Sequence, residues 1–345
     1  MIKYLGSKRQ LIPEILQTVQ EAAPRARRIL DLFSGTSRVG HALKREGYQV
    51  LANDHNTYAY LLAKCYVETD LEEVEQQAAQ LISEFNLLPG CAGYFTESFC
   101  VQSRFFHPKN GERVDAIREN IAKKNLDPTL EAVMLVSLME AADRVDSTCG
   151  IQMAYLKDWA LRAHKDLELR LPALLPRAAA GVGQAHRSDA LQAAQQLPVD
   201  VVYLDPPYNQ HSYRGNYHIW ESLALWDKSE LYGCAKKRMD CKTKKSAFNS
   251  KTQFMQAFSG VFRALQCDVA VISFSNEGFV TRESMLELFR ERGRVTTKSI
   301  DYKRYVGAQI GIYSPKGKVV GEVSHLRNQE YLYVVHMENP RSTHP

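Results

Sequence analysis

The stretch RILDLFSGTSRVGHALKREGYQVLAND, residues 28–54, decides the fold. Residues 28–33 and 48–54 have the apolar character of buried strands, and SGTSRVG opens a segment typical of a helix that runs through Arg45. A strand, a glycine-containing turn, a helix and a second strand in this order are typical of a parallel β-α-β unit. We therefore expect an α/β protein with a doubly wound, Rossmann-like sheet.

The turn after the first strand predicts a ligand site, because doubly wound sheets bind ligands where their strands end. Gly35 allows a close approach to the backbone, but the turn lacks GxGxxG and GK[ST], so no pyrophosphate is indicated. Asp54 ends the second strand 19 residues later, where an acid can accept hydrogen bonds from both ribose hydroxyls. It could also simply cap the next helix. With Asp31 and Phe33 nearby, we favour a nucleoside pocket.

The middle of the chain has the apolar periodicity of helices. Residues 71–85, 114–125, 129–143 and 156–169 each predict a helix, with Asp127 as the cap and Pro128 in the first turn of the third. Strand patterns return at residues 181–186, 199–204, 268–274, 294–300, 307–313 and 330–335, the last three as an antiparallel ribbon at the sheet edge. We expect residues 1–70 and 181–345 to form one split α/β domain around a helical insert, residues 71–180.

Composition narrows the class of protein. The 345 residues are 45% hydrophobic and carry a net charge of +5, which permits a polyanionic partner. The seven cysteines form no CxxC pair, and Cys234 and Cys241 lack companions at zinc spacing, so we expect no metal and a reducing environment. No signal core and no apolar run near the roughly 20 residues of a membrane span is visible. We expect a cytoplasmic protein.

The strand at residues 199–204 is followed by DPPY, residues 205–208. An exocyclic amine of adenine or cytosine is a poor nucleophile unless two acceptors, each about 3 Å away, engage its hydrogens. Asp205 supplies a carboxylate and the Pro206 carbonyl a second acceptor, whose direction the prolines fix because their φ is locked. Tyr208 can stack on a base that has left the duplex. The alternative is an Asp-Pro turn with a surface tyrosine.

These motifs resemble those of the Dam-like class of adenine-specific DNA methyltransferases, which use S-adenosylmethionine (SAM). The likeness covers most of the chain and rests on KYLGSK (3–8), DLFSGTSRVG (31–40), HRSDAL (186–191), DPPY, NYHIWESLALW (216–226), ISFSNEG (272–278) and LRNQEYLYVV (326–335). Ser7 stands where a second glycine is common, and Ser37 where glycine or threonine is usual. Both are small, so the loop geometry should survive.

The resemblance implies a role for each matched position. It implies cofactor contacts from Tyr4, Lys8, Asp31, Phe33, Gly35, Asp54, Asp189 and Asp205, and catalysis by Asp205, Pro206, Pro207 and Tyr208. Asp54 would bind the ribose of SAM and Asp189 its adenine. Residues 71–180 would be the target-recognition insert, and the acceptor would be N6 of adenine in duplex DNA.

Two basic stretches suit contact with DNA. Residues 234–251 carry seven Lys or Arg residues against one Asp, and we expect phosphate contacts from Lys236, Lys237, Arg238, Lys242, Lys244 and Lys245. A merely solvated loop is the alternative. In residues 104–118, Arg104, Lys109, Arg113 and Arg118 surround Phe105 and Phe106, which are more typical of a core than of base wedges.

Other functions stay open at this point. N4-methylation of cytosine uses the same geometry, and a catalytically silent DNA-binding homologue would keep the fold. The complete set of Asp54, Asp189 and DPPY argues against decay of the site. A cognate restriction endonuclease is a possible partner.

Overall fold

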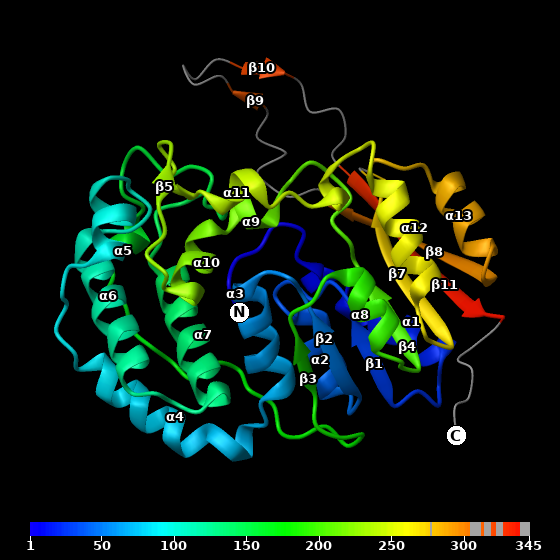
Figure 1. The fold of residues 1–345 in the computed structure, drawn as a ribbon, viewed down its shortest axis with the longest axis horizontal. Coiled ribbons are helices and arrows are strands. Elements are labelled where there is room, and N and C mark those ends of the chain that lie inside the picture. Colours follow the sequence, from blue (N-terminus) through cyan, green and yellow to red (C-terminus); the bar gives the residue numbers. More distant parts are fainter. Residues whose placement is uncertain (277, 304–311, 314–318, 322–326, 339–345) are drawn as a thin grey trace.

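The computed structural model describes residues 1–276, 278–303, 312–313, 319–321 and 327–338. At its centre lies a seven-stranded sheet with the strand order β3-β2-β1-β4-β7-β11-β8 (Figure 1). These strands are β1 Arg28–Asp31, β2 Gln49–Asn53, β3 Gln184–His186, β4 Val201–Leu204, β7 Val269–Ser275, β8 Gly293–Lys303 and β11 Arg327–Met337. The expected α/β class is confirmed.

The order of the strands brings β1 and β4 together. These two strands pair with each other in parallel. The pairs β1–β2, β2–β3 and β4–β7 are also parallel, whereas β11 runs antiparallel to β7 and β8. Asp31 at the end of β1 lies opposite Tyr203 on β4. The chain turns to opposite sides of the sheet after these two strands, and the crevice between their carboxyl ends is where such sheets bind ligands.

Helices cover both faces of the sheet because its strands are apolar on both sides. Ile29 on β1 packs with Ile15 and Leu43 on one face, and the next residue, Leu30, packs with Phe258 and others on the opposite face. The helices on these faces are α1 Ile12–Ala22 and α2 Arg38–Arg45 on the first, and α8 Ala190–Gln196, α12 Phe254–Ala264 and α13 Arg282–Arg290 on the second.

A second, helical body adjoins the sheet and fills the left of Figure 1. Phe105 and Phe106 are fully buried in its core, which confirms their interpretation as core residues. Asp127 accepts a hydrogen bond from the Thr129 amide, which confirms the cap. The helices here are α3 Thr57–Ala63, α4 Leu71–Asn86, α5 Tyr94–Thr96, α6 Pro108–Lys123, α7 Pro128–Arg144, α9 Tyr213–Asn216 and α10 His218–Leu225.

The prediction of a helix at residues 156–169 is wrong. Only a 3-10 turn, Leu161–His164, forms there. The backbone amides of Leu167 and Leu169 bond instead to the side chains of Asn110 on α6 and Asn86 on α4. Long-range side-chain acceptors therefore replace the bonds that a helix would make within itself.

Short elements complete the described chain. They are the 3-10 segments Lys8–Gln10 and Ala247–Asn249, the π-helical segments Lys64–Glu68 and Glu97–Val101, α11 Asp240–Thr243, and the strands β5 Leu231–Tyr232, β6 Lys237–Arg238, β9 Ile312–Tyr313 and β10 Val319–Gly321. Of the strand expected at residues 307–313, all but Ile312 and Tyr313 lie outside the described residues.

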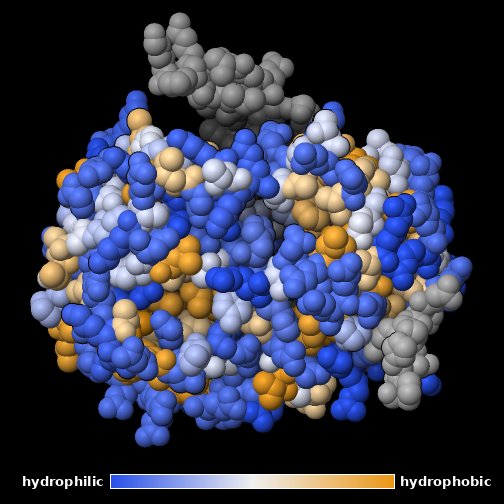
Figure 2. Space-filling model, in the orientation of Figure 1, coloured by the Kyte–Doolittle hydropathy of each residue, from blue (hydrophilic) through white to orange (hydrophobic). Residues whose placement is uncertain are grey.

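The described helices were compared with the requirements of a membrane span. Within the described ranges, none of the helices combines the length and the apolar character that crossing a bilayer requires. Figure 2 shows that the visible face is mostly hydrophilic, with hydrophobic side chains in small patches. Such scattered apolar residues are normal on a folded protein.

Candidate active site

A cavity of about 460 Å³ lies at the carboxyl ends of β1, β2 and β4. The structure gathers many of the residues expected in the site around it: Tyr4, Lys8, Asp31, Phe33, Gly35, Asp54, Asp189, Asp205, Pro207, Lys244 and Lys245. The other expected residues, which do not line it, are Pro206, Tyr208, Lys236, Lys237, Arg238 and Lys242. Segments far apart in sequence thus meet at the crevice between β1 and β4.

The turn between β1 and α2 wraps tightly around one end of the cavity. Gly35 has a φ of +50°, and a Cβ there would come within 3.3 Å of the Tyr4 ring. Ser37 is fully buried and also left-handed, with a φ of 57°, so a serine keeps the turn that glycine usually makes. Asp31 accepts a bond from the Gly40 amide at 3.1 Å, yet burial raises the pKa of Asp31 to about 7.

Asp54 follows β2 directly and faces this turn. Its Oδ2 accepts from the Gly35 amide at 3.1 Å, and its Oδ1 accepts from the Asn56 amide at 2.9 Å. The side chain is 12% exposed and lines the cavity. Asp54 therefore ties the ends of β1 and β2 together, and a carboxylate oxygen has lone pairs left for further donors.

Asp189 and Phe33 both line the cavity. Asp189 is the N-cap of α8 and accepts from the Leu191 amide at 2.9 Å. Phe33 meets Phe248 edge to face, with ring centroids 5.2 Å apart. Asp189 supplies a polar wall and the two rings an apolar one, a combination that suits a flat, polar-edged ring such as a nucleobase.

Lys8 forms an ion pair with Asp205 just beyond the end of β4. Lys8 Nζ lies 3.0 Å from Asp205 Oδ1, and the two side chains are 7% and 21% exposed. Burial raises the pKa of Asp205 to about 6, Lys8 opposes this rise, and the carboxylate of Glu330 adds to it. Asp205 is therefore a carboxylate that is partly open to the cavity and held by a buried ammonium group.

The residues after Asp205 form a rigid irregular segment. Pro206 is buried and Pro207 lines the cavity. The Tyr208 ring packs against Phe274 with centroids 4.9 Å apart, and Lys8 Nζ lies 5.8 Å from its centre. Tyr208 accepts from the Phe279 amide through its carbonyl, at 3.0 Å. The tyrosine ring is thus fixed beside Asp205, not free at the surface as in an Asp-Pro turn.

The basic residues of the stretch 234–251 differ in how deeply they are buried. Arg238 is 3% exposed and donates to both carboxylate oxygens of Asp227 at 2.7 Å. It also lies 3.4 Å from Asp240, which receives a bond from buried Arg214 at 3.0 Å. Arg238 therefore fastens the loop to the protein, whereas Lys242, Lys244 and Lys245 further along the loop are exposed.

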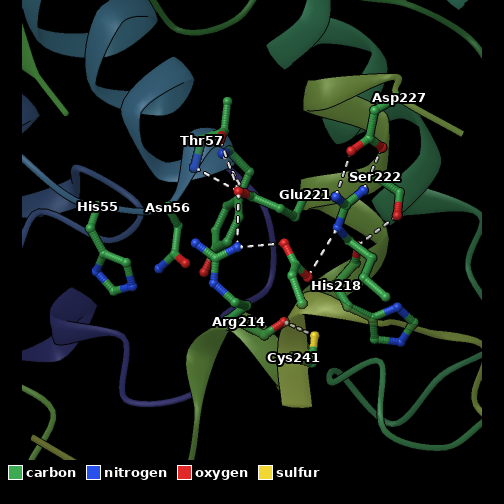
Figure 3. A network of polar contacts seen from close by, with 12 residues as sticks. His55, Asn56, Thr57, Arg214, His218, Glu221, Ser222, Asp227 and Cys241 are labelled. Carbon is green, nitrogen blue, oxygen red and sulfur yellow. Dashed lines mark hydrogen bonds and ion pairs between the residues drawn. The ribbon is translucent and has the colours of Figure 1, made fainter. Parts of the chain in front are cut away.

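Arg214 extends this network toward Glu221 and the start of α3 (Figure 3). Its guanidinium lies 3.6 Å from Glu221, which accepts from the amides of Thr57 and Tyr58 at the start of α3. Because α3 begins right after Asp54 and Asn56, the network joins the basic loop to the end of β2. Sequence reasoning missed Arg214, because it lies in the polar stretch SYRGN, residues 212–216, where no pattern marks it.

The lysines at the end of the basic loop reach the cavity itself. Lys244 and Lys245 are exposed and line it. Asn249, a residue that sequence reasoning missed, donates to the carbonyls of Asn209 and His211 at 2.9 and 3.1 Å. The loop is therefore tied to the segment that follows Tyr208.

The four basic residues of 104–118 have mostly structural partners, so our interpretation of them as a duplex contact is revised. Arg118 is buried and donates to the carbonyls of Leu223 and Ala224, which end α10. Arg113 donates to the carbonyls that end α4, and Lys109 pairs with Asp166. Arg104 lies over the Trp159 ring at 4.7 Å. The guanidinium groups of Arg113 and Arg118 therefore bind carbonyl oxygens at helix ends and are not available for phosphates.

Several buried polar atoms of residues that line the cavity have no hydrogen-bond partner in the part of the chain that the structure describes. They include Oγ of Ser7, Oγ of Ser34 and Oδ1 of Asn56. Buried polar atoms are normally satisfied, so these indicate a polar ligand. Among the described residues no group of three or more His, Cys, Asp or Glu could hold a metal ion.

The comparison with protein families agrees with this geometry. Residues 4–270 match the family described as D12 class N6 adenine-specific DNA methyltransferases. The match covers strands β1 to β4, the residues that line the cavity and the helical body, which is well over half of the chain, so the chain belongs to this family. The protein is an enzyme that methylates adenine in DNA.

Individual relatives give the same picture. The chain is 28% identical to the Type II methyltransferase M.NlaIII of Neisseria lactamica, over 96% of this chain and 100% of that protein. It is 27% identical to the Type II methyltransferase M.CviAII of Paramecium bursaria Chlorella virus 1, over 98% and 99%. It is 28% identical to the modification methylase StsI of Streptococcus sanguinis, over 90% of this chain but half of that protein.

Proposed function

We propose that the enzyme transfers the methyl group of SAM to N6 of a flipped-out adenine within a specific site of duplex DNA. The observation that carries this proposal is the placement of Asp205 beside Lys8 at the end of β4, in the cavity that Asp31 and Asp54 also line. That arrangement puts an amine-binding carboxylate next to a nucleoside-sized polar pocket. SAM supplies an electrophilic methyl group on a sulfonium sulfur.

The residues around the first turn fit such a cofactor. Asp54 offers carboxylate lone pairs to ribose hydroxyls, while Ser34 and Asn56 offer the unpartnered atoms described above. Asp189 and the Phe33 ring would hold the adenine of the cofactor. The tight turn at Gly35 leaves room for close approach of a ligand to the backbone.

Asp205 is proposed to bind the reacting amine. Its carboxylate accepts one N–H of adenine N6, and the carbonyl of Pro206 accepts the other, which releases the nitrogen lone pair from the ring. Tyr208, fixed against Phe274, offers a face for the extruded base and offsets part of the unstacking cost. The positive charge that develops on the nitrogen then lies beside a carboxylate.

The duplex is proposed to lie across the exposed lysines of the basic loop, with residues 71–180, which form part of the helical body, reading the sequence. Lys242, Lys244 and Lys245 are exposed, and Lys236 and Lys237 are half-buried. Arg238 enters this proposal as the anchor of the loop rather than as a phosphate contact, because its guanidinium is already paired.

Replacement of Asp54 by alanine should weaken SAM binding roughly tenfold or more. The change removes the proposed ribose acceptor, and a hydrogen bond to a charged group is typically worth about 1.5–3 kcal/mol. Calorimetric titration with SAM measures the effect, and Asp158→Ala, an exposed acid in the helical body, is the charge-matched control. Unchanged affinity in Asp54→Ala would remove Asp54 from the cofactor site.

Joint replacement of Lys244 and Lys245 by alanine should weaken binding to all duplexes about equally. Phosphate contacts carry no base information, and the slope of log affinity against log salt should become shallower by about 0.9 per lost contact. Arg25→Ala/Arg27→Ala is the matched control. These exposed arginines precede β1 and so lie at the amino ends of the strands, away from the cavity at the carboxyl ends. An unchanged slope would leave the two lysines as solvated residues.

The names of the relatives suggest a cellular role. They name Type II methyltransferases and modification methylases. We propose that this enzyme likewise protects one DNA sequence from a cognate restriction endonuclease in the cytoplasm. Sequencing of modified bases in DNA from a host that expresses the chain should reveal methylated adenine at a single motif, whereas methylation spread over unrelated sequences would contradict the proposal.

A further inference from the structure

A fully buried glutamate lies behind the Lys8–Asp205 pair. Glu330 on β11 has no exposed surface, and its Oε1 accepts from Lys8 Nζ at 2.7 Å and from the Ser273 hydroxyl. Its Oε2 has no hydrogen-bond partner among the residues that the structure describes. Lys8 Nζ is thus shared by two carboxylates, one that lines the cavity and one that is sealed within the sheet layer.

The position of Glu330 is one where an apolar residue would serve the fold better. Alternate residues of a strand share a face, so Glu330 lies on the same side as Leu332 and Val334, which pack in the cluster around α1. Burial of charged groups is costly, and apolar replacements of a buried ion pair are often neutral or stabilising. A glutamate here calls for a reason other than stability.

The chemistry of the pair supplies that reason. With Lys8 alone, the charge of Asp205 would be cancelled, and a full positive charge would lie near a nitrogen that becomes positive during transfer. Two carboxylates around one ammonium leave a net negative charge. They also hold Lys8 from both sides, which fixes the orientation of Asp205.

We propose that Glu330 is a positioning residue for methyl transfer, which holds Lys8 and makes the cluster of Lys8, Asp205 and Glu330 net negative toward the reacting amine. The inference rests on the proposed function, because it takes Asp205 as the group that binds adenine N6. Glu330 touches neither substrate in this scheme and acts through Lys8.

The principal test is Glu330→Gln, which keeps the shape and an acceptor for Lys8 but removes the charge. We expect kcat to fall about 10- to 100-fold, the range found when a carboxylate one contact behind a metal ligand is removed. The KM values for SAM and DNA should stay within about threefold, because Glu330 does not contact either. Glu287→Gln, an exposed position on α13, is the control with the same change of charge.

A pH profile distinguishes this role from a structural one. The titratable and charged groups that face Asp205 are Lys8, Glu330, Tyr203, Tyr208, Tyr213 and Asp31. Among them Glu330 raises the pKa of Asp205, so its loss should move the acid limb of kcat/KM to lower pH. Glu330→Asp keeps the charge and should restore the limb toward the wild-type position. A variant with wild-type kcat and an unmoved limb would overturn the inference.

A double-mutant cycle covers the case in which Glu330→Gln alone fails to fold. Lys8→Met/Glu330→Gln leaves neither an unpaired lysine nor an unpaired glutamate buried. If Glu330 acts through Lys8, the double variant should transfer methyl groups within about twofold of Lys8→Met in single turnover. A further loss of tenfold or more would show an independent role and contradict the proposal. A wild type that forms no N6-methyladenine from SAM would instead refute the proposed function.

Discussion

Asp205→Asn is expected to slow methyl transfer by about 10²–10³, with SAM and DNA binding largely retained. Removal of one interaction with the charge that develops in a transition state typically has this effect. Asparagine is nearly isosteric, so the packing of Pro206 and Tyr208 at the end of β4 should survive. It lacks the carboxylate charge and can present an amide donor to adenine N6.

Single-turnover methylation of a duplex that contains the target site measures this loss. SAM titration and a DNA binding assay on the same preparation report whether the site is otherwise intact. Asp158→Asn provides the control for the change of charge, because Asp158 is exposed in the helical body. A rate within about threefold of wild type would exclude Asp205 from the mechanism.

The activity of the wild type should fall about tenfold for each unit of pH below 6. Burial raises the pKa of Asp205 to about 6, and only the ionised carboxylate offers a negative charge to the amine whose hydrogen bond it accepts. The carboxylate is therefore present above pH 6 and lost as the pH falls through it. At pH 4 the expected loss is about 100-fold, whereas an ordinary aspartate would still be about half ionised there.

The pH dependence of kcat/KM for DNA, measured at saturating SAM, tests this expectation. Saturation limits the influence of Asp31, whose pKa burial raises to about 7 and which lies on the proposed cofactor side. The raised pKa of Asp205 means that its protonation favours the folded state, so this group gives no reason for unfolding between pH 6 and 4. An acid limb near pH 4 would show that burial does not perturb Asp205 as described.

The sheet and the cofactor end of the cavity could be predicted from local patterns. Residues 28–54 contain a complete β-α-β unit, and Asp54 is defined by its place after a strand. The sequence also places DPPY directly after β4, so parallel pairing alone brings Asp205 to the same edge as Asp31.

The remaining parts depend on contacts that no local pattern contains. The chain at residues 156–169 has helical periodicity, but backbone amides there donate hydrogen bonds to the side chains of Asn86 and Asn110. Both asparagines lie more than fifty residues away in the sequence. Arg238 lies in a basic run that predicts contacts with DNA phosphates, yet it forms ion pairs with Asp227 and Asp240. Glu330 is within a matched motif, and only the pairing of β11 with β7 brings it to Lys8.

The most direct test of the whole account is to follow the label from methyl-labelled SAM into unmethylated duplex DNA and to identify the labelled nucleoside by mass spectrometry. Genomic DNA serves as the substrate, so the recognition sequence need not be known. The account predicts label in N6-methyladenine with the wild type and almost none with Asp205→Asn. Label in N4-methylcytosine, or equal labelling of adenine by both proteins, would contradict it.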